Sequence, residues 1–165
     1  MVFAFVSLPF EEVFAPVFET ISKAVVLRGL NAIRSEPIDE RITPPAMAAV
    51  ETHIRNSRLV IADLTGSCVN VLQAVRYASG LGKPRILISQ EEPEKTAFHA
   101  QGVNIYPYDL EDLDSLQSLL LKLAADLSTT EAHGLDDAGF HGSISAKVGL
   151  MHIVPSQWKN PFAGD

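Results

Sequence analysis

Apolar residues along the chain alternate between short continuous runs and longer segments with helical spacing. Residues 2–6 are wholly apolar, as in a strand that is buried on both faces of a sheet. From Phe10, apolar residues recur every three or four positions, which predicts a helix that Gly29 ends. The same alternation continues further along the chain. It predicts strands at 30–34, 58–63, 84–89 and 103–106, and helices at 46–56, 70–81 and 113–127.

Strands that alternate with helices at this spacing need right-handed crossovers and form a parallel sheet covered on both faces. The pattern therefore predicts an α/β fold over residues 1–128, with a doubly wound, five-stranded parallel sheet. After Ser128 the periodicity fails. Residues 129–165 are expected to form an irregular C-terminal extension.

This extension carries more large apolar side chains than a solvated tail can hold. We expect them to pack on the domain itself or on a second copy, which would give a twofold symmetric homodimer. The residues concerned are Ile144, Val148, Leu150, Met151, Ile153, Val154, Trp158 and Phe162.

Composition narrows the classes of partner. The 20 Asp and Glu residues outnumber the 13 Lys and Arg residues, and the formal net charge of -7 disfavours nucleic acid and anionic membrane surfaces as partners. No apolar run approaches the roughly 20 residues of a membrane span, and the first residues lack the basic stretch of a secretory signal. A cytoplasmic protein with a small-molecule or protein partner is expected.

Neither a metal site nor a cofactor is predicted. The five histidines have no spacing that would set two ligands on one helical face, and Cys68 has no histidine near it in sequence. The chain also lacks a P-loop and a G-x-G-x-x-G fingerprint.

In a doubly wound sheet, ligands bind outside the carboxyl ends of the strands. The loops at 7–10, 34–40 and 63–70 and the loop from Ser89 should meet there. Their candidate ligand-binding residues are Ser7, Pro9, Phe10, Asp63, Thr65, Gly66 and Asn70. The charged residues of the second loop, which either contact a ligand or are simply solvated, are Arg34, Asp39, Glu40 and Arg41.

Asp63 is the strongest of these candidates. Its carboxylate can accept hydrogen bonds from sugar hydroxyls, while Thr65, Gly66 and the start of the next helix can bind a phosphate. Alternatively, Asp63 fixes its own loop and Asn70 caps the helix. Phe10 either stacks on a base or packs as a hydrophobic staple.

Three segments resemble the nucleoside 2-deoxyribosyltransferase-like superfamily, which is similar in fold to TIR domains. They are FVSLPF at 5–10, IRNSRLVIADLTG at 54–66, and 70–84, where NVL and YA precede LGKP. The resemblance covers roughly residues 2–90. It implies a flavodoxin-like sheet, a bound nucleoside or nucleotide, and cleavage or transfer at an N-glycosidic bond.

That chemistry needs a carboxylate beside the anomeric carbon. The family supplies a glutamate from the third helix, in the pattern Asn-Val-aromatic-Tyr-Glu-Leu-Gly-Tyr-Ala. In this chain Ala74 replaces the glutamate and Arg76 replaces the glycine. Loss of the carboxylate removes most of the rate, so the usual reaction is expected to be absent while Asp63 keeps a binding role. Arg76 either faces a phosphate or points outward.

Three hypotheses follow. The first is a pseudoenzyme that binds a nucleoside or nucleotide without cleaving it. The second is an active N-glycosidase or deoxyribosyltransferase that uses a substitute carboxylate, for which the candidates are Glu40, Glu51, Glu91, Glu92 and Glu94. The third is a protein-interaction module whose purpose is self-association.

Overall fold

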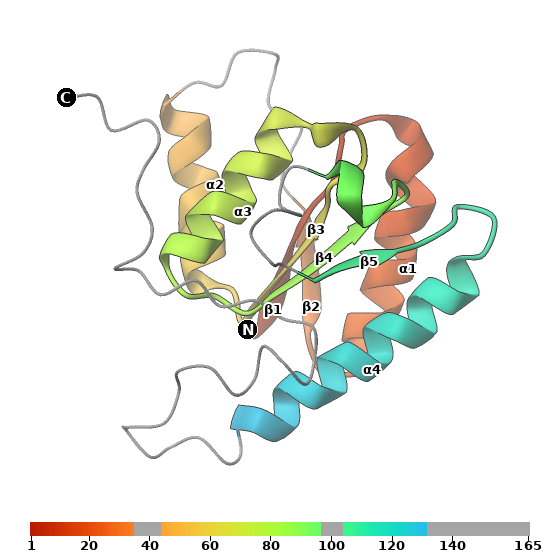
Figure 1. Ribbon diagram of the computed structural model, residues 1–165. Helices are drawn as coiled ribbons and strands as arrows, with labels where there is room; N and C mark the ends of the chain where they lie inside the picture. The colour runs from red at the N-terminus through yellow and green to blue at the C-terminus, as the bar shows by residue number, and fades with distance from the viewer. Residues whose placement is uncertain (35–43, 97–103, 132–165) are drawn as a thin grey trace.

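The computed structural model describes residues 1–34, 44–96 and 104–131 of the chain. Five strands form one sheet in the order β2-β1-β3-β4-β5, and every neighbouring pair is parallel (Figure 1). This is the flavodoxin-like arrangement. The predicted doubly wound α/β fold with a five-stranded parallel sheet is therefore confirmed.

Every predicted strand and helix is present. The strands are β1 (Phe3–Ser7), β2 (Asn31–Arg34), β3 (Leu59–Asp63), β4 (Arg85–Ser89) and β5 (Ile105–Pro107). The helices are α1 (Ala15–Val26), α2 (Pro44–Asn56), α3 (Val69–Gly80) and α4 (Leu113–Glu131). Short 3-10 turns lie at Glu12–Phe14, Thr65–Ser67 and Pro93–Lys95.

The predicted start of the first helix at Phe10 is wrong. The chain first makes the 3-10 turn, and α1 begins at Ala15, with Pro16 in its first turn. Proline has no N–H and its ring clashes with the carbonyl of the preceding turn, so Pro16 fits near a helix start and not in a helix interior. The apolar spacing continues across this boundary, which made the helix seem longer.

Two boundaries near the end of the sheet also differ from the prediction. The last strand is Ile105–Pro107 rather than 103–106, and Val103 lies outside the described residues. Helix α4 continues to Glu131, so the first residues of the expected irregular extension are helical. The remainder of that extension, with the apolar side chains expected to pack on the domain itself or on a second copy, lies outside the described residues.

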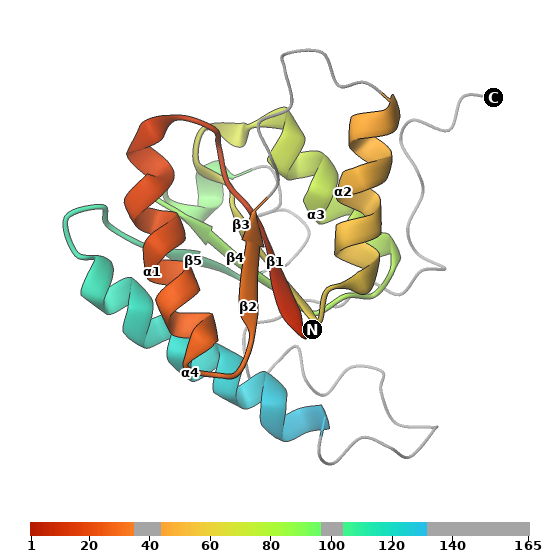
Figure 2. The same ribbon diagram turned by 180° about the vertical axis from the view of Figure 1, so that it is seen from behind.

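Helices cover both faces of the sheet. Figures 1 and 2 show α1 and α4 on one face and α2 and α3 on the other. Because successive strand residues point to opposite faces, alternate positions of β1 and β3 contribute to separate cores. Ala4, Val6 and Ile61 pack under α1 and α4, whereas Phe5 and Val60 pack under α2 and α3.

All four helices run in the same sense, because each follows the sheet's parallel strands back to their starting side. We call the side where the strands end the carboxyl edge, and the side where they begin the amino edge. Every helix begins at the carboxyl edge and ends at the amino edge. Within the described ranges, no helix combines the length and apolar content needed to cross a bilayer.

Candidate functional site

Asp63 is the last residue of β3, and its side chain is 0% exposed. One carboxylate oxygen, Oδ1, accepts hydrogen bonds from the backbone N–H of Thr65 (2.9 Å) and from its hydroxyl (2.5 Å). This closes a turn in which the aspartate side chain replaces a backbone acceptor. The carboxylate therefore fixes the start of the β3–α3 loop.

Tyr108 holds the other carboxylate oxygen of Asp63. Its hydroxyl donates to Asp63 Oδ2, and its backbone N–H donates to the carbonyl of Ser89 (3.0 Å). Tyr108 follows β5, and β4 lies between β5 and β3 in the sheet, so the hydrogen bond to Asp63 joins segments on either side of β4. One side chain thus connects the ends of two strands that are not neighbours.

Gln90 completes the connection between these loops. Its side-chain amide donates to the Tyr108 hydroxyl (3.0 Å), and its backbone N–H donates to the Thr65 hydroxyl (3.0 Å). Asp63, Thr65, Gln90 and Tyr108 therefore form one continuous set of hydrogen bonds, which we call the strand-end network. It joins the carboxyl ends of β3, β4 and β5.

Burial shapes the proton affinities in this network. Removal from water raises the pKa of Asp63 above its ordinary value, although the hydrogen bonds from Thr65 and Tyr108 act in the opposite direction. Burial, followed by the neighbouring charge of Asp63, raises the pKa of Tyr108 far above that of a free tyrosine. Tyr108 therefore remains protonated and acts as a hydrogen-bond donor to the carboxylate.

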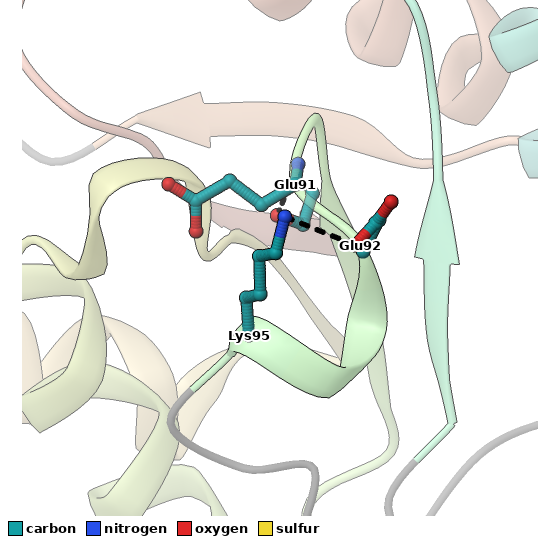
Figure 3. A network of polar contacts seen from close by, with 4 residues as sticks. Glu91, Glu92 and Lys95 are labelled. Atoms are coloured by element: carbon teal, nitrogen blue, oxygen red, sulfur yellow. Dashed lines mark hydrogen bonds and ion pairs between the residues drawn. The ribbon is translucent and has the colours of Figure 1, made fainter.

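Glu91 meets the start of α3 at the same edge. Its Oε1 accepts a hydrogen bond from the backbone N–H of Gly66 (3.2 Å). Gly66 has a φ of 72°, a left-handed conformation that glycine adopts without steric cost. In the same loop as Glu91, Lys95 pairs with Glu92 at 3.0 Å, and the Glu91 side chain extends away from that pair (Figure 3). The Gly66 N–H, one of the groups that were expected to hold a phosphate, thus already has a carboxylate partner.

The first loop lies beside this edge and is held by Arg34. Ser7 is 3% exposed and pairs in register with Ala62, the residue before Asp63. Arg34 Nη2 donates to the carbonyl oxygen of Pro9 (2.9 Å). The same guanidinium lies 5.7 Å from the centroid of the Phe18 ring, within cation–π range. Arg34 therefore contributes to the fold of the loop.

The remaining candidates of the first two loops have different positions. Pro9 is buried and Phe10 is half-buried. Asp39, Glu40 and Arg41 lie outside the described residues.

Asn70 does not cap α3, contrary to one alternative for this residue. The residue at the cap position is Cys68, and Asn70 is the second residue of the helix. Helix α3 begins at Val69, one residue before the predicted start. Gly66 and Ser67, which both have positive φ, already turn the chain toward the helix. Arg76 lies seven residues beyond Val69, about 10 Å along the helix axis, and so is not brought together with the strand-end network.

Ala74 packs into the core and does not line the carboxyl edge. It is 1% exposed and lies in a cluster with Phe3, Phe5, Ile54 and Val60. The space next to this position is therefore occupied by aromatic and aliphatic side chains. Among the proposed substitute carboxylates, Glu51 is on α2, while Glu91, Glu92 and Glu94 follow β4.

Sequence reasoning missed Tyr108 as a partner of Asp63, and it missed Gln90, which donates to Thr65 and Tyr108. It did indicate that the loop from Ser89 would reach this edge, but not which side chains would meet. No group of three or more His, Cys, Asp and Glu side chains in the described part of the chain is arranged to hold a metal ion.

The fold and this edge define a flavodoxin-like α/β domain with a fixed, polar carboxyl edge. A comparison with models of protein families finds no match to the chain, and a comparison with curated proteins finds none either.

Proposed function

We propose that the protein binds a nucleoside or nucleotide at the carboxyl edge of its sheet and leaves the glycosidic bond intact. The observation that carries this proposal is the strand-end network. It fixes three loops at the edge where doubly wound sheets receive ligands. A ligand then meets a preorganised surface and loses less free energy to loop ordering.

Asp63 serves in this proposal as a positioning residue. Its carboxylate is buried and already accepts three hydrogen bonds, so it acts through Thr65 and Tyr108. The partly exposed groups at this edge include Thr65, Gln90, Glu91 and Phe10. They offer a hydroxyl, an amide, a carboxylate and an aromatic ring, which is a set suited to the hydroxyls and the base of a nucleoside.

The environment of Ala74 supports the second half of the proposal. A carboxylate beside the anomeric carbon needs a polar cavity, whereas this position belongs to an apolar cluster that includes Phe3 and Phe5. Ala74 offers no acid, and it lies buried in an apolar cluster. Binding without cleavage is the function that fits both features.

Thermal denaturation with a panel of nucleosides, mononucleotides and dinucleotides tests the binding. A ligand at about 100 times its dissociation constant stabilises the fold by roughly 2.7 kcal/mol, which is visible as a higher melting temperature. At least one member of the panel should produce this shift. Asp63→Ala should abolish it by releasing the β3–α3 loop, whereas Glu19→Ala, which changes an exposed acid on α1, should not.

The same samples test the absence of cleavage. Chromatography of nucleosides and nucleotides after incubation with pure protein should detect no free base above background. A panel without any stabilising compound would remove the basis for ligand binding. Steady base release would instead favour the active glycosidase.

A further inference from the structure

Charge is divided between the two edges of the sheet. Residues 53–88 contain a single acid, Asp63, which is buried at the carboxyl edge. Their bases are Arg55, Arg58, Arg76, Lys83 and Arg85. Four of the five lie where α2 and α3 end and where β3 and β4 begin, so they belong to the amino edge.

These amino-edge bases are held close together. Lys83 Nζ donates to the carbonyl of Ser57 (2.7 Å), and Arg85 Nη1 donates to the carbonyl of Lys83 (3.2 Å). Arg55 reaches the Tyr77 hydroxyl on α3 (2.7 Å). Arg55 and Arg58 are exposed, so this edge presents positive charge to the solvent.

The carboxyl edge has the opposite charge. Residues 90–114 contain one base, Lys95, which pairs with Glu92. Their acids are Glu91, Glu92, Glu94, Asp109, Glu111, Asp112 and Asp114. Apart from Glu91, all of these acids are exposed. Helix dipoles favour this division, because every helix has its positive end at the carboxyl edge and its negative end at the amino edge.

Exposed apolar side chains gather at the same two edges. The large apolar residues with the greatest exposure in the described part of the chain precede a strand or begin or end a helix. At the amino edge they are Met1, Val2, Val26, Leu27 and Leu81, and at the carboxyl edge Val13 and Val69. The amino edge thus combines charge with apolar surface, as protein interfaces do, whereas the carboxyl edge adds two exposed valines to its acids.

We propose that copies of this chain associate head to tail, with the amino edge of one copy against the carboxyl edge of the next. A twofold contact through either edge alone would place like charges opposite each other, which is unfavourable. The head-to-tail contact instead pairs Arg55 and Arg58 with exposed acids such as Glu94 and Glu111. Because an assembly of any length still has one free amino edge and one free carboxyl edge, it grows into a chain or closes into a ring.

Sedimentation and light scattering of the full chain test this directly. Mass should increase with protein concentration beyond a dimer in about 50 mM salt. The apparent dissociation constant should rise by at least about tenfold in about 0.5 M salt, because salt at this concentration screens charges that are more than a few ångströms apart. An association that ends at a dimer, or that salt does not weaken, would overturn the proposal, as would a monomer at every concentration.

Charge reversal gives a sharper test. Arg55→Glu with Arg58→Glu makes both edges acidic, and Glu94→Lys with Glu111→Lys gives the carboxyl edge added positive charge. Each double variant alone should remain monomeric, and an equal mixture of the two should assemble again. Restored assembly also shows that both variants are folded. Lys122→Glu and Glu19→Lys, exposed residues within helices α4 and α1, should leave assembly unchanged.

A mixture that stays monomeric would contradict the pairing of these two edges. The experiment contains no nucleoside or nucleotide, so its outcome is independent of the proposed ligand-binding function.

Discussion

The strand-end network should be worth a large part of the protein's stability, and its central pair can be tested by a double-mutant cycle. Tyr108→Phe removes the hydroxyl that donates to Asp63 and leaves one carboxylate oxygen without that partner. An unsatisfied buried polar group costs about 1 to 3 kcal/mol. Asp63→Ala removes the acceptor of three hydrogen bonds, two of them from Thr65.

The magnitude for Asp63→Ala follows from these contacts. Thr65 and Tyr108 are half-buried, so water can replace part of what they lose. The raised pKa of Asp63 shows that burying its charge costs free energy, and the alanine variant does not have this cost. We expect a loss of about 2 to 5 kcal/mol, against a total of about 5 to 15 kcal/mol for a typical domain. The melting temperature should fall by about 2 to 4 °C for each kcal/mol.

Urea unfolding of the wild type, both single variants and the double variant measures the coupling. If Asp63 and Tyr108 act through their mutual hydrogen bond, the two losses should be non-additive by about 1 kcal/mol or more. Glu94→Ala, an exposed acid, serves as the control and should change stability by less than about 0.5 kcal/mol. Additive losses would show that the pair does not join the ends of β3 and β5 in solution.

Two further predictions concern single positions. Burial raises the pKa of Asp63 in the folded state above the ordinary value of 3.8 that applies to the unfolded chain. At a pH between the unfolded-state and folded-state pKa, the folded state binds more protons than the unfolded chain, so the free energy of unfolding should fall as pH rises. Unfolding of wild type and Asp63→Asn across that window should show this dependence only in the wild type; equal slopes would contradict it. Hydrogen bonds from Ser115 lower the pKa of Asp112, which gives stability the opposite pH dependence. Because both proteins contain Asp112, the comparison cancels this contribution. Ala74→Glu should destabilise the fold by about 3 kcal/mol or more by burying a carboxylate among apolar groups, whereas exposed Ala48→Glu should not. Calorimetry measures both, and a stable Ala74→Glu variant that releases base would refute the filled-site argument.

The fold was predictable because its signals are local. The strands β1, β3 and β4 are buried at every position, and the sequence marks such strands as short apolar runs between helices. The start of α1 was missed although Pro16 indicates it, because the apolar spacing from Phe10 outweighed the proline. Local periodicity thus identified the element, and a single backbone restriction determined where it begins.

The candidate site was only partly predictable. The sequence placed Asp63 at a strand end and identified the missing carboxylate at Ala74. It could not show that Tyr108 crosses over β4 to reach Asp63, because that contact depends on the order of strands in the sheet. Nor could it show that Ala74 is buried in one apolar cluster with Phe3 and Phe5. Both facts depend on packing between residues far apart in the chain.

The direction of the helices connects the two proposals. Acids gather at the carboxyl edge, so a phosphate there meets Glu91 at the Gly66 N–H. The described cations nearest to this edge are already engaged: Arg34 binds the Pro9 carbonyl, and Lys95 pairs with Glu92. An uncharged nucleoside needs no additional cation. A nucleotide would need positive charge near its phosphate, and in the proposed head-to-tail assembly the basic amino edge of the neighbouring copy would bring it. Nucleotide binding would therefore be coupled to assembly, whereas nucleoside binding would not depend on it.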